Sequence, residues 1–148
     1  MPSTHLALHV HVIFSTKDRM PLIAPDWLDR LHSFAGGVVG NLGAVPEAVG
    51  GVSDHMHLLI GLRATHSVAE VVRSVKAVSS RWVHEEIGMP KFSWQEGYGA
   101  FSVSPSQCPV VRDYINGQAE HHRKKGFQEE YLEFLKKCGV EFDERFVW

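Results

Sequence analysis

The sequence lacks several features that would assign it to a class at once. Only two of its 148 residues are cysteines, Cys108 and Cys138, and they form no CxxC pair. This argues against a disulfide framework and a zinc ribbon, so we expect each thiol to be buried or half-buried. No apolar run approaches the roughly 20 residues of a membrane span, and the N-terminus has no signal pattern. We therefore expect a cytoplasmic protein that makes no membrane contact.

The chain also lacks a strong charge of either sign. Its formal net charge is −2 at pH 7, whereas a domain that binds nucleic acid is typically basic. Any basic surface must therefore come from clustered residues, although a solvated surface position is the ordinary alternative for each of them. The candidates for phosphate contacts are Lys17, Arg19, Arg73, Lys76, Arg123, Lys124 and Lys125.

The length and the 44% hydrophobic content fit one domain with an ordinary core, spanning residues 1–148. Apolar and polar residues alternate from Leu6 to Phe14 and again from His55 to Leu62, which predicts two strands. Ala44 to Val52 reads as a further strand, joined to the His55 strand by a tight turn. Ala100 to Ser104 is predicted to be the last strand of the sheet.

Four helices are predicted between and after these strands. Asp26 is the expected N-cap of the first helix, and Ser67-Val68-Ala69-Glu70 is a capping box that begins the second. Gly88 is expected to end the second helix. A third helix is predicted at about 106–125, and a C-terminal amphipathic helix with its tail at 127–148.

Two histidines on the predicted strand are candidate metal ligands. His55 and His57 point to one face of the strand, whereas Met56, Leu58 and Ile60 point to the other face, which is the core face. Two imidazoles side by side on a rigid strand can share one divalent metal ion and need only one or two further ligands. A pair of surface histidines on a half-exposed sheet is the ordinary alternative.

A second pair of polar residues lies on the third predicted helix. Tyr114 and Gln118 are four residues apart and therefore share one face of the helix. A tyrosine becomes a nucleophile of covalent catalysis once its phenol pKa is lowered from about 10. A glutamine amide oxygen one turn away can supply a hard ligand to a metal held by two histidines. Together, the strand pair and the helix pair predict a site.

The residues resemble the single-tyrosine HUH transposases of the insertion sequence 200/605-like family, which includes the repeat-associated tyrosine transposases. The matching segments are His11-Val12-Ile13-Phe14-Ser15-Thr16-Lys17-Asp18-Arg19, Asp54-His55-Met56-His57-Leu58-Leu59, Ser74-Val75-Lys76, Gly97-Tyr98-Gly99-Ala100-Phe101-Ser102-Val103-Ser104 and Tyr114-Ile115-Asn116-Gly117-Gln118-Ala119-Glu120-His121-His122. A His-hydrophobe-His element with a downstream Tyr-x-x-x-Gln is specific as a combination. One position departs from the family pattern, because Gly117 stands where an asparagine is expected.

The resemblance implies a ferredoxin-like α+β domain, with a central antiparallel sheet and packed helices, that forms a homodimer. His55 and His57 would bind Mg²⁺ or Mn²⁺ with Gln118 as third ligand, and the metal would polarise a phosphate of single-stranded DNA with hairpin ends. Tyr114 would attack that phosphorus, leaving a 5′-phosphotyrosine link and a free 3′-OH. The tyrosine helix could sit at the histidine pair of its own chain or of the partner chain.

Two other functions remain open on the sequence alone. The protein could be a domesticated module that binds hairpin DNA but no longer transposes. It could also be a metal-dependent enzyme of another class, in which His9 and His11 complete a histidine-rich zinc site. His9 and His11 repeat the geometry of the later histidine pair on the first strand, but no downstream element pairs with them.

Overall fold

In the computed structural model, which describes residues 3–118 and 126–140, four strands form one antiparallel sheet in the order β2-β3-β1-β4. The strands are β1 (Leu8–Ser15), β2 (Val45–Val52), β3 (His55–Leu62) and β4 (Gly99–Val103). β1 and β3 are the two central strands, so the predicted histidine strand lies inside the sheet, with a hydrogen-bonded neighbour on each side.

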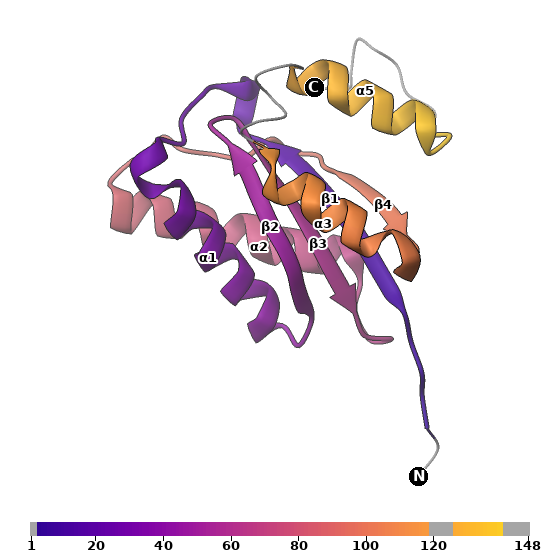
Figure 1. Cartoon of the computed structure of the whole chain (residues 1–148). Helices are drawn as coiled ribbons and strands as arrows, with labels where there is room; N and C mark the ends of the chain where they lie inside the picture. Colours follow the sequence, from indigo (N-terminus) through magenta and orange to yellow (C-terminus); the bar gives the residue numbers. More distant parts are fainter. Residues whose placement is uncertain (1–2, 119–125, 141–148) are drawn as a thin grey trace.

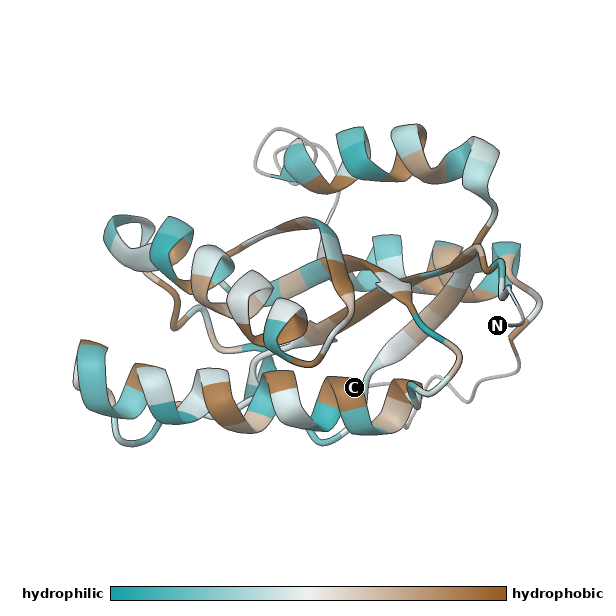
Figure 2. Cartoon of the chain, turned by 90° about the horizontal axis from the view of Figure 1, so that it is seen from below, coloured by the Kyte–Doolittle hydropathy of each residue, from teal (hydrophilic) through white to brown (hydrophobic). Residues whose placement is uncertain are grey.

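Helices cover both faces of this sheet (Figures 1 and 2). The helices are α1 (Pro25–Asn41), α2 (Val68–Trp82), α3 (Cys108–Asn116) and α5 (Phe127–Lys137). α1 and α2 pack on one face, and α3 and α5 pack on the other. Short turns of 3₁₀-helix at Lys17–Arg19 and Pro105–Gln107 and a π-helical turn at Val83–Ile87 complete the elements.

The chain order β1-α1-β2-β3-α2-β4 is that of a ferredoxin-like domain, in which each βαβ half places its helix on the same face of the sheet. α3 and α5 follow this unit and cover the opposite face. The predicted α+β class, with its central antiparallel sheet and packed helices, is confirmed. Among the described residues, no helix is long and apolar enough to cross a membrane.

Period-two alternation explains why both faces of the sheet are buried. Phe14, Met56 and Leu58 point into the core beneath α1 and α2. Their neighbours Ile13 and Leu59 point the other way, into smaller apolar clusters beneath α5 and α3. The face that carries His55 and His57 is therefore covered by helices and does not meet solvent as a half-exposed sheet would.

The capping residues predicted from the sequence are correct for α2 and wrong for α1. Ser67 caps α2, since its side-chain oxygen accepts a hydrogen bond from the amide of Glu70 at 3.4 Å, and Gly88 follows the π-helical turn with a left-handed φ of +84°. The prediction of Asp26 as an N-cap was wrong. Ala24 occupies that position and Pro25 begins α1, which places Asp26 in the first turn, where its charge favours the helix dipole.

The predicted tyrosine helix of about 106–125 is described by the structure only as far as residue 118. α3 ends at Asn116, and Gly117 is its C-cap, with an amide that donates to the carbonyl of Asp113 at 3.0 Å. A glycine in a helix interior is less stable than an alanine there by about 1 kcal/mol, which explains why the helix breaks at this residue. Residues 119–125 of the predicted span lie outside the described residues.

The two cysteines differ from each other in burial. Cys108 is buried at the start of α3, as predicted, whereas Cys138 is exposed, so the expectation of a covered thiol was wrong there. Cys138 is the C-cap of α5 and lies one turn beyond the part of the helix that contacts the sheet.

Replacing Leu31 by alanine tests the main core. Leu31 is fully buried on α1, so we expect Leu31→Ala to lower the free energy of unfolding by about 2–5 kcal/mol through lost apolar contact and a cavity. Urea denaturation measures this change. Leu6→Ala is the matched control, since Leu6 is 49% exposed, and its effect should stay within about 0.5 kcal/mol. Equal effects in the two variants would contradict the assigned core.

Candidate active site

The two histidines of β3 lie side by side beneath the second helical layer. His55 and His57 are both fully buried, and their ring centroids are 5.1 Å apart. His11 on β1 joins them, because Nε2 of His11 and Nδ1 of His57 are 2.9 Å apart. Of the rival pair on β1, His11 therefore belongs to this cluster, whereas His9 pairs with Glu47 elsewhere on the same face. The structure does not gather His9 and His11 around one point.

Both ring nitrogens of His55 have an oxygen atom within hydrogen-bond distance. Nδ1 of His55 lies 2.7 Å from the Asp54 carboxylate, a hydrogen-bond acceptor. Nε2 of the same ring lies 3.2 Å from Oε1 of Gln118. The amide orientation of Gln118 is fixed because its Nε2 donates to the carbonyl of Tyr114 at 3.2 Å. An imidazole nitrogen beside an amide oxygen gives two donor atoms that a divalent cation can bind.

His57 has a carboxylate as its other neighbour. Nε2 of His57 is 3.1 Å from Oε1 of Glu130, a residue of α5 whose side chain is also buried. One ligand atom from each of His55, His57 and Glu130 lies within 4.8 Å of the others. Two imidazoles, a carboxylate and the Gln118 amide oxygen form a mixed N/O donor set suited to a divalent cation. The residues present therefore fit the metal that the resemblance implies.

Tyr114 of α3 lies against these histidines within the same chain. The ring centroids of Tyr114 and His57 are 5.7 Å apart, and those of Tyr114 and His11 are 6.2 Å apart. Burial raises the pKa of the Tyr114 phenol above its ordinary value and is the largest cause of the shift. A hydrogen bond to the Glu130 carboxylate raises this pKa further, and a hydrogen bond to Gln118 opposes the shift. A phenol in this environment stays protonated until positive charge or a base reaches it.

His11 remains neutral beside these groups. Burial and, to a smaller extent, the nearby His57 lower the pKa of His11 to about 3, and Glu130 opposes the shift. A neutral His11 offers one donor and one acceptor, so it can hold the ring of His57 in a fixed orientation through their short contact. His11 is therefore placed to orient a candidate ligand, as partners behind metal ligands commonly do.

Two glycines allow the second helical layer to approach the sheet. A Cβ on Gly50 of β2 would overlap the carbonyl oxygen of Ile115 and lie 2.9 Å from its Cγ2 atom. A Cβ on Gly99 of β4 would lie 2.7 Å from the hydroxyl of Tyr131 on α5. The lack of side chains at these two positions lets α3 and α5 dock closely enough to bring Tyr114 and Glu130 to the histidines.

Residues 4–118, well over half of the chain, match the family model of the IS200-like transposases. The chain belongs to this transposase family. Two solved structures share the transposase fold. A candidate transposase from Deinococcus radiodurans R1 aligns with a TM-score of 0.64 and 22% identity, covering 80% of this chain and 95% of that chain. A REP-associated tyrosine transposase bound to a REP hairpin aligns with a TM-score of 0.59 and 13% identity, covering 86% of this chain and 74% of that chain. The comparison with curated proteins gave no match.

The basic residues proposed for DNA contacts are dispersed over this transposase. Lys17 is exposed and Arg19 half-buried in the turn after β1, and Arg73 is exposed on α2. Lys76 is half-buried, and its ammonium donates to the carbonyls of Glu96 at 3.1 Å and Gly97 at 2.8 Å. Lys76 therefore holds the loop that precedes β4. Arg123, Lys124 and Lys125 lie outside the described residues.

Arg73 and Lys76 line a hollow of 490 Å³ between α2 and the segment before β4. Tyr98 borders it with 37% of its surface exposed, and Trp94 contributes a buried wall. The indole of Trp94 donates to the hydroxyl of Ser79 at 3.0 Å and packs on Phe14, which places it in the core. Of the two aromatics, Tyr98 has the accessible ring.

The site contains one residue that sequence reasoning missed. Glu130 reaches the cluster from α5, which follows Tyr114 along the chain with residues 119–125 between. One signal was present, since Glu130 lies four residues before Phe134 and one before Tyr131 in the apolar stripe of the last helix. A carboxylate within an apolar stripe requires a partner when buried. The pattern does not reveal which partner that is.

Proposed function

We propose that this transposase cleaves and rejoins single-stranded DNA, with Tyr114 as the nucleophile and a divalent metal held by His55, His57 and Gln118. The single observation that carries the proposal is the approach of Tyr114 to the buried histidine pair, at 5.7 Å between ring centroids, with Gln118 in contact with His55. A tyrosine, two imidazoles and an amide oxygen converge here from elements far apart in the sequence.

In the proposed cleavage step, the Tyr114 hydroxyl oxygen forms a bond to the DNA phosphorus. The bond from phosphorus to the 3′ oxygen breaks, and that oxygen leaves as a free 3′-OH after taking up a proton from water. The phenol proton passes to the carboxylate of Glu130, which is hydrogen-bonded to Tyr114. The product is a 5′-phosphotyrosine, and a 3′-OH from another strand reverses the step without ATP because the phosphodiester energy is retained.

Mg²⁺ or Mn²⁺ at this site would polarise the phosphate and stabilise the phenolate of the nucleophile. The chain's own residues orient the donors: the Asp54 carboxylate contacts Nδ1 of His55, and His11 holds the ring of His57. Glu130 adds a carboxylate that can either complete the donor set or accept the phenol proton. Imidazoles favour metals softer than Mg²⁺, so we expect Mn²⁺ to bind more tightly.

The DNA partner is part of the proposal. A relative of the same fold is bound to a REP hairpin, and we infer that hairpin-ended single-stranded DNA is the substrate class here. Arg73 beside the exposed ring of Tyr98 offers a cation and a stacking surface for an unpaired base. Lys17 and Arg19 are further candidates for phosphate contacts near the end of β1. Homodimerisation, expected from the resemblance, remains a prediction, although one chain alone brings Tyr114 to its own histidines.

The test combines the full chain with labelled single-stranded hairpin DNAs and Mn²⁺ or Mg²⁺, followed by a denaturing gel. We expect a band that carries both protein and label, dependent on added metal and lost when EDTA is present. A binding assay on the same DNAs without denaturation shows whether the substrate is bound. Folded, metal-loaded protein that binds hairpins but gives no adduct across a varied hairpin library would contradict cleavage and would favour the domesticated binding module.

Gly50 offers a test of how α3 is placed. We expect Gly50→Ala to lower the adduct yield by about 100-fold, because the new Cβ must push Ile115 and its helix away from the sheet, and small misplacements of reacting groups have effects of this size. The gel assay measures it. Gly37→Ala is the matched control, since a Cβ on this residue of α1 meets nothing within 4 Å, and it should retain full yield. A fully active Gly50→Ala protein would contradict the placement.

A further inference from the structure

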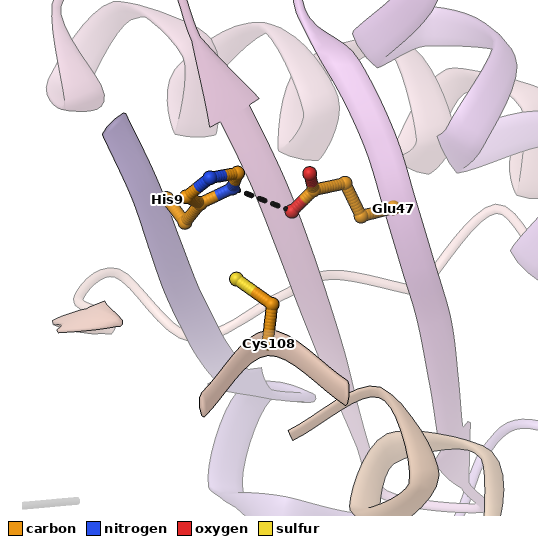
Figure 3. A group of neighbouring side chains, drawn as sticks. All are labelled: His9, Glu47 and Cys108. Carbon is orange, nitrogen blue, oxygen red and sulfur yellow. Dashed lines mark hydrogen bonds and ion pairs between the residues drawn. The ribbon is translucent and has the colours of Figure 1, made fainter. Parts of the chain in front are cut away.

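A second cluster of metal-ligating side chains lies apart from the proposed active site. His9 of β1, Glu47 of β2 and Cys108 at the start of α3 point toward one another (Figure 3). Nδ1 of His9 and Oε2 of Glu47 are 2.8 Å apart, and the potential ligand atoms of all three residues lie within 4.8 Å of one another. We propose that His9, Glu47 and Cys108 form a zinc site that fastens the beginning of the tyrosine helix to the sheet.

The backbone of β2 directs Glu47 into this cluster. The register of β2 against β3 shifts between Pro46 and Ala48, so Glu47 is the extra residue of a β-bulge. A bulge re-aims the side chain it carries and commonly occurs where a side chain is needed at a particular place. The bulge in β2 therefore directs the Glu47 side chain toward α3.

The intervening strand leaves room for Glu47 to reach His9. β3 lies between β2 and β1, and its residue at this level is Gly61, which pairs with His9 on one side and with Val45 on the other. A Cβ on Gly61 would lie 3.5 Å from Oε1 of Glu47 and 3.7 Å from its Cδ. Because Gly61 has no side chain, the Glu47 carboxylate can lie over β3 and contact the His9 imidazole.

The donor set fits zinc better than it fits the hard cations. An imidazole nitrogen, a carboxylate oxygen and a thiolate sulfur are ligands that Zn²⁺ takes at about 2.0–2.3 Å, whereas Mg²⁺ prefers oxygen alone. Cys108 is buried, and the side chains of His9 and Glu47 keep 19% and 16% of their surface exposed. Three protein ligands with partial access to solvent leave the fourth position of a tetrahedral site for water.

A reactive thiol is the weaker interpretation of Cys108. Burial, with a further contribution from the Glu47 carboxylate, raises the pKa of the Cys108 thiol, although Arg112 opposes the shift. Its sulfur donates weakly to the carbonyl of Ser104 at 3.6 Å. A protonated, covered thiol is a poor nucleophile, because the thiolate is the reactive form. Zinc binding would release that one proton to solvent as the Cys108 sulfur bonds to the metal.

The consequence concerns the tyrosine helix. Cys108 is the first residue of α3, and Tyr114 follows six residues later, about 9 Å along the axis. A metal that joins Cys108 to β1 and β2 would hold this end of the helix, while Ile115 packs against Gly50 near the other end. This proposed zinc site holds whether or not Tyr114 acts as a nucleophile, since its ligands are separate from the proposed active-site cluster.

Cobalt is a suitable probe, because Co²⁺ occupies zinc sites and gives a near-ultraviolet charge-transfer band only when a thiolate is bound. We expect CoCl₂ to produce this band in the full chain and ZnCl₂ to abolish it. Cys108→Ser should lose the band, and Cys138→Ser, which alters the exposed second cysteine, should keep it. The His55 and His57 cluster contains no cysteine, so cobalt bound there gives no such band.

The two other ligands are tested in the same titration. We expect His9→Gln and Glu47→Gln each to raise the cobalt concentration at half-saturation by about tenfold or more. Hydrogen exchange at the amides of 108–116 should slow when ZnCl₂ is added to the native chain and stay unchanged in Cys108→Ser. Absence of the band in the native chain, its survival in Cys108→Ser, or unchanged half-saturation in both glutamine variants would each overturn the zinc site. Circular dichroism of every variant confirms that it is folded.

Discussion

The Tyr114→Phe protein should fold, bind hairpin DNA and form no covalent adduct. The substitution removes only the hydroxyl that would bond to phosphorus, so the adduct yield should fall by at least about a thousandfold, as expected for loss of the nucleophile in a covalent mechanism. The ring can still pack against His11, His57 and Phe134. Removing the hydroxyl takes a hydrogen-bond partner from the buried Glu130 carboxylate, so the free energy of unfolding should fall by about 1–3 kcal/mol while the chain still folds.

Tyr131→Phe provides the matched control for this variant. Tyr131 is a buried tyrosine on α5, beside Gly99 and outside the histidine cluster, and burial raises its pKa as well. The Tyr131→Phe variant should form the adduct with a yield within about twofold of the native yield, since a substitution away from the reacting groups has little effect. An adduct that survives Tyr114→Phe, or that disappears equally in both variants, would contradict the assigned nucleophile.

The second large effect is expected at His57. We expect His57→Gln to weaken Mn²⁺ binding by at least about 100-fold and to lower the adduct yield in proportion, because it removes an imidazole ligand that no neighbour replaces. Calorimetric titration with MnCl₂ measures binding independently of DNA. Glutamine is chosen over alanine because His57 contacts both His11 and Glu130. Alanine would leave a cavity there, and the buried Glu130 carboxylate would lose its contact with residue 57.

His5→Ala is the control for the histidine variant. His5 is exposed and precedes β1, so its loss should change neither Mn²⁺ affinity nor adduct yield. Native Mn²⁺ affinity in folded His57→Gln protein would exclude His57 as a ligand. Unchanged affinity together with a lost adduct would instead indicate that His57 contributes to the chemistry without holding the metal.

The sequence predicted the parts of the site that depend on local periodicity. Alternation placed His55 and His57 on one face of a strand, and a spacing of four residues brought Gln118 back to the carbonyl of Tyr114. The resemblance added the α+β class with a central antiparallel sheet and packed helices, which the structure confirms. Local periodicity repeats along an element and is therefore readable from the residues alone.

The remaining features depend on contacts between distant elements. Glu130 enters the cluster because α5 docks near Gly99, and nothing in the residues around Glu130 specifies that docking. The bulge at Glu47 arises from the register between two strands, which alternation does not fix by itself. His11 was weighed as part of a rival pair, and only the pairing of β1 with β3 places it beside His57.

The most direct test of the proposed nucleophile is to identify the residue that carries the DNA. The native protein is allowed to react with a hairpin DNA and Mn²⁺, the adduct is digested with protease and nuclease, and the modified peptide is sequenced by mass spectrometry. We predict a nucleotide attached through its 5′ phosphate to Tyr114, and to neither Tyr98 nor Tyr131. Attachment to another residue, or attachment through a 3′ phosphate, would contradict the proposed mechanism.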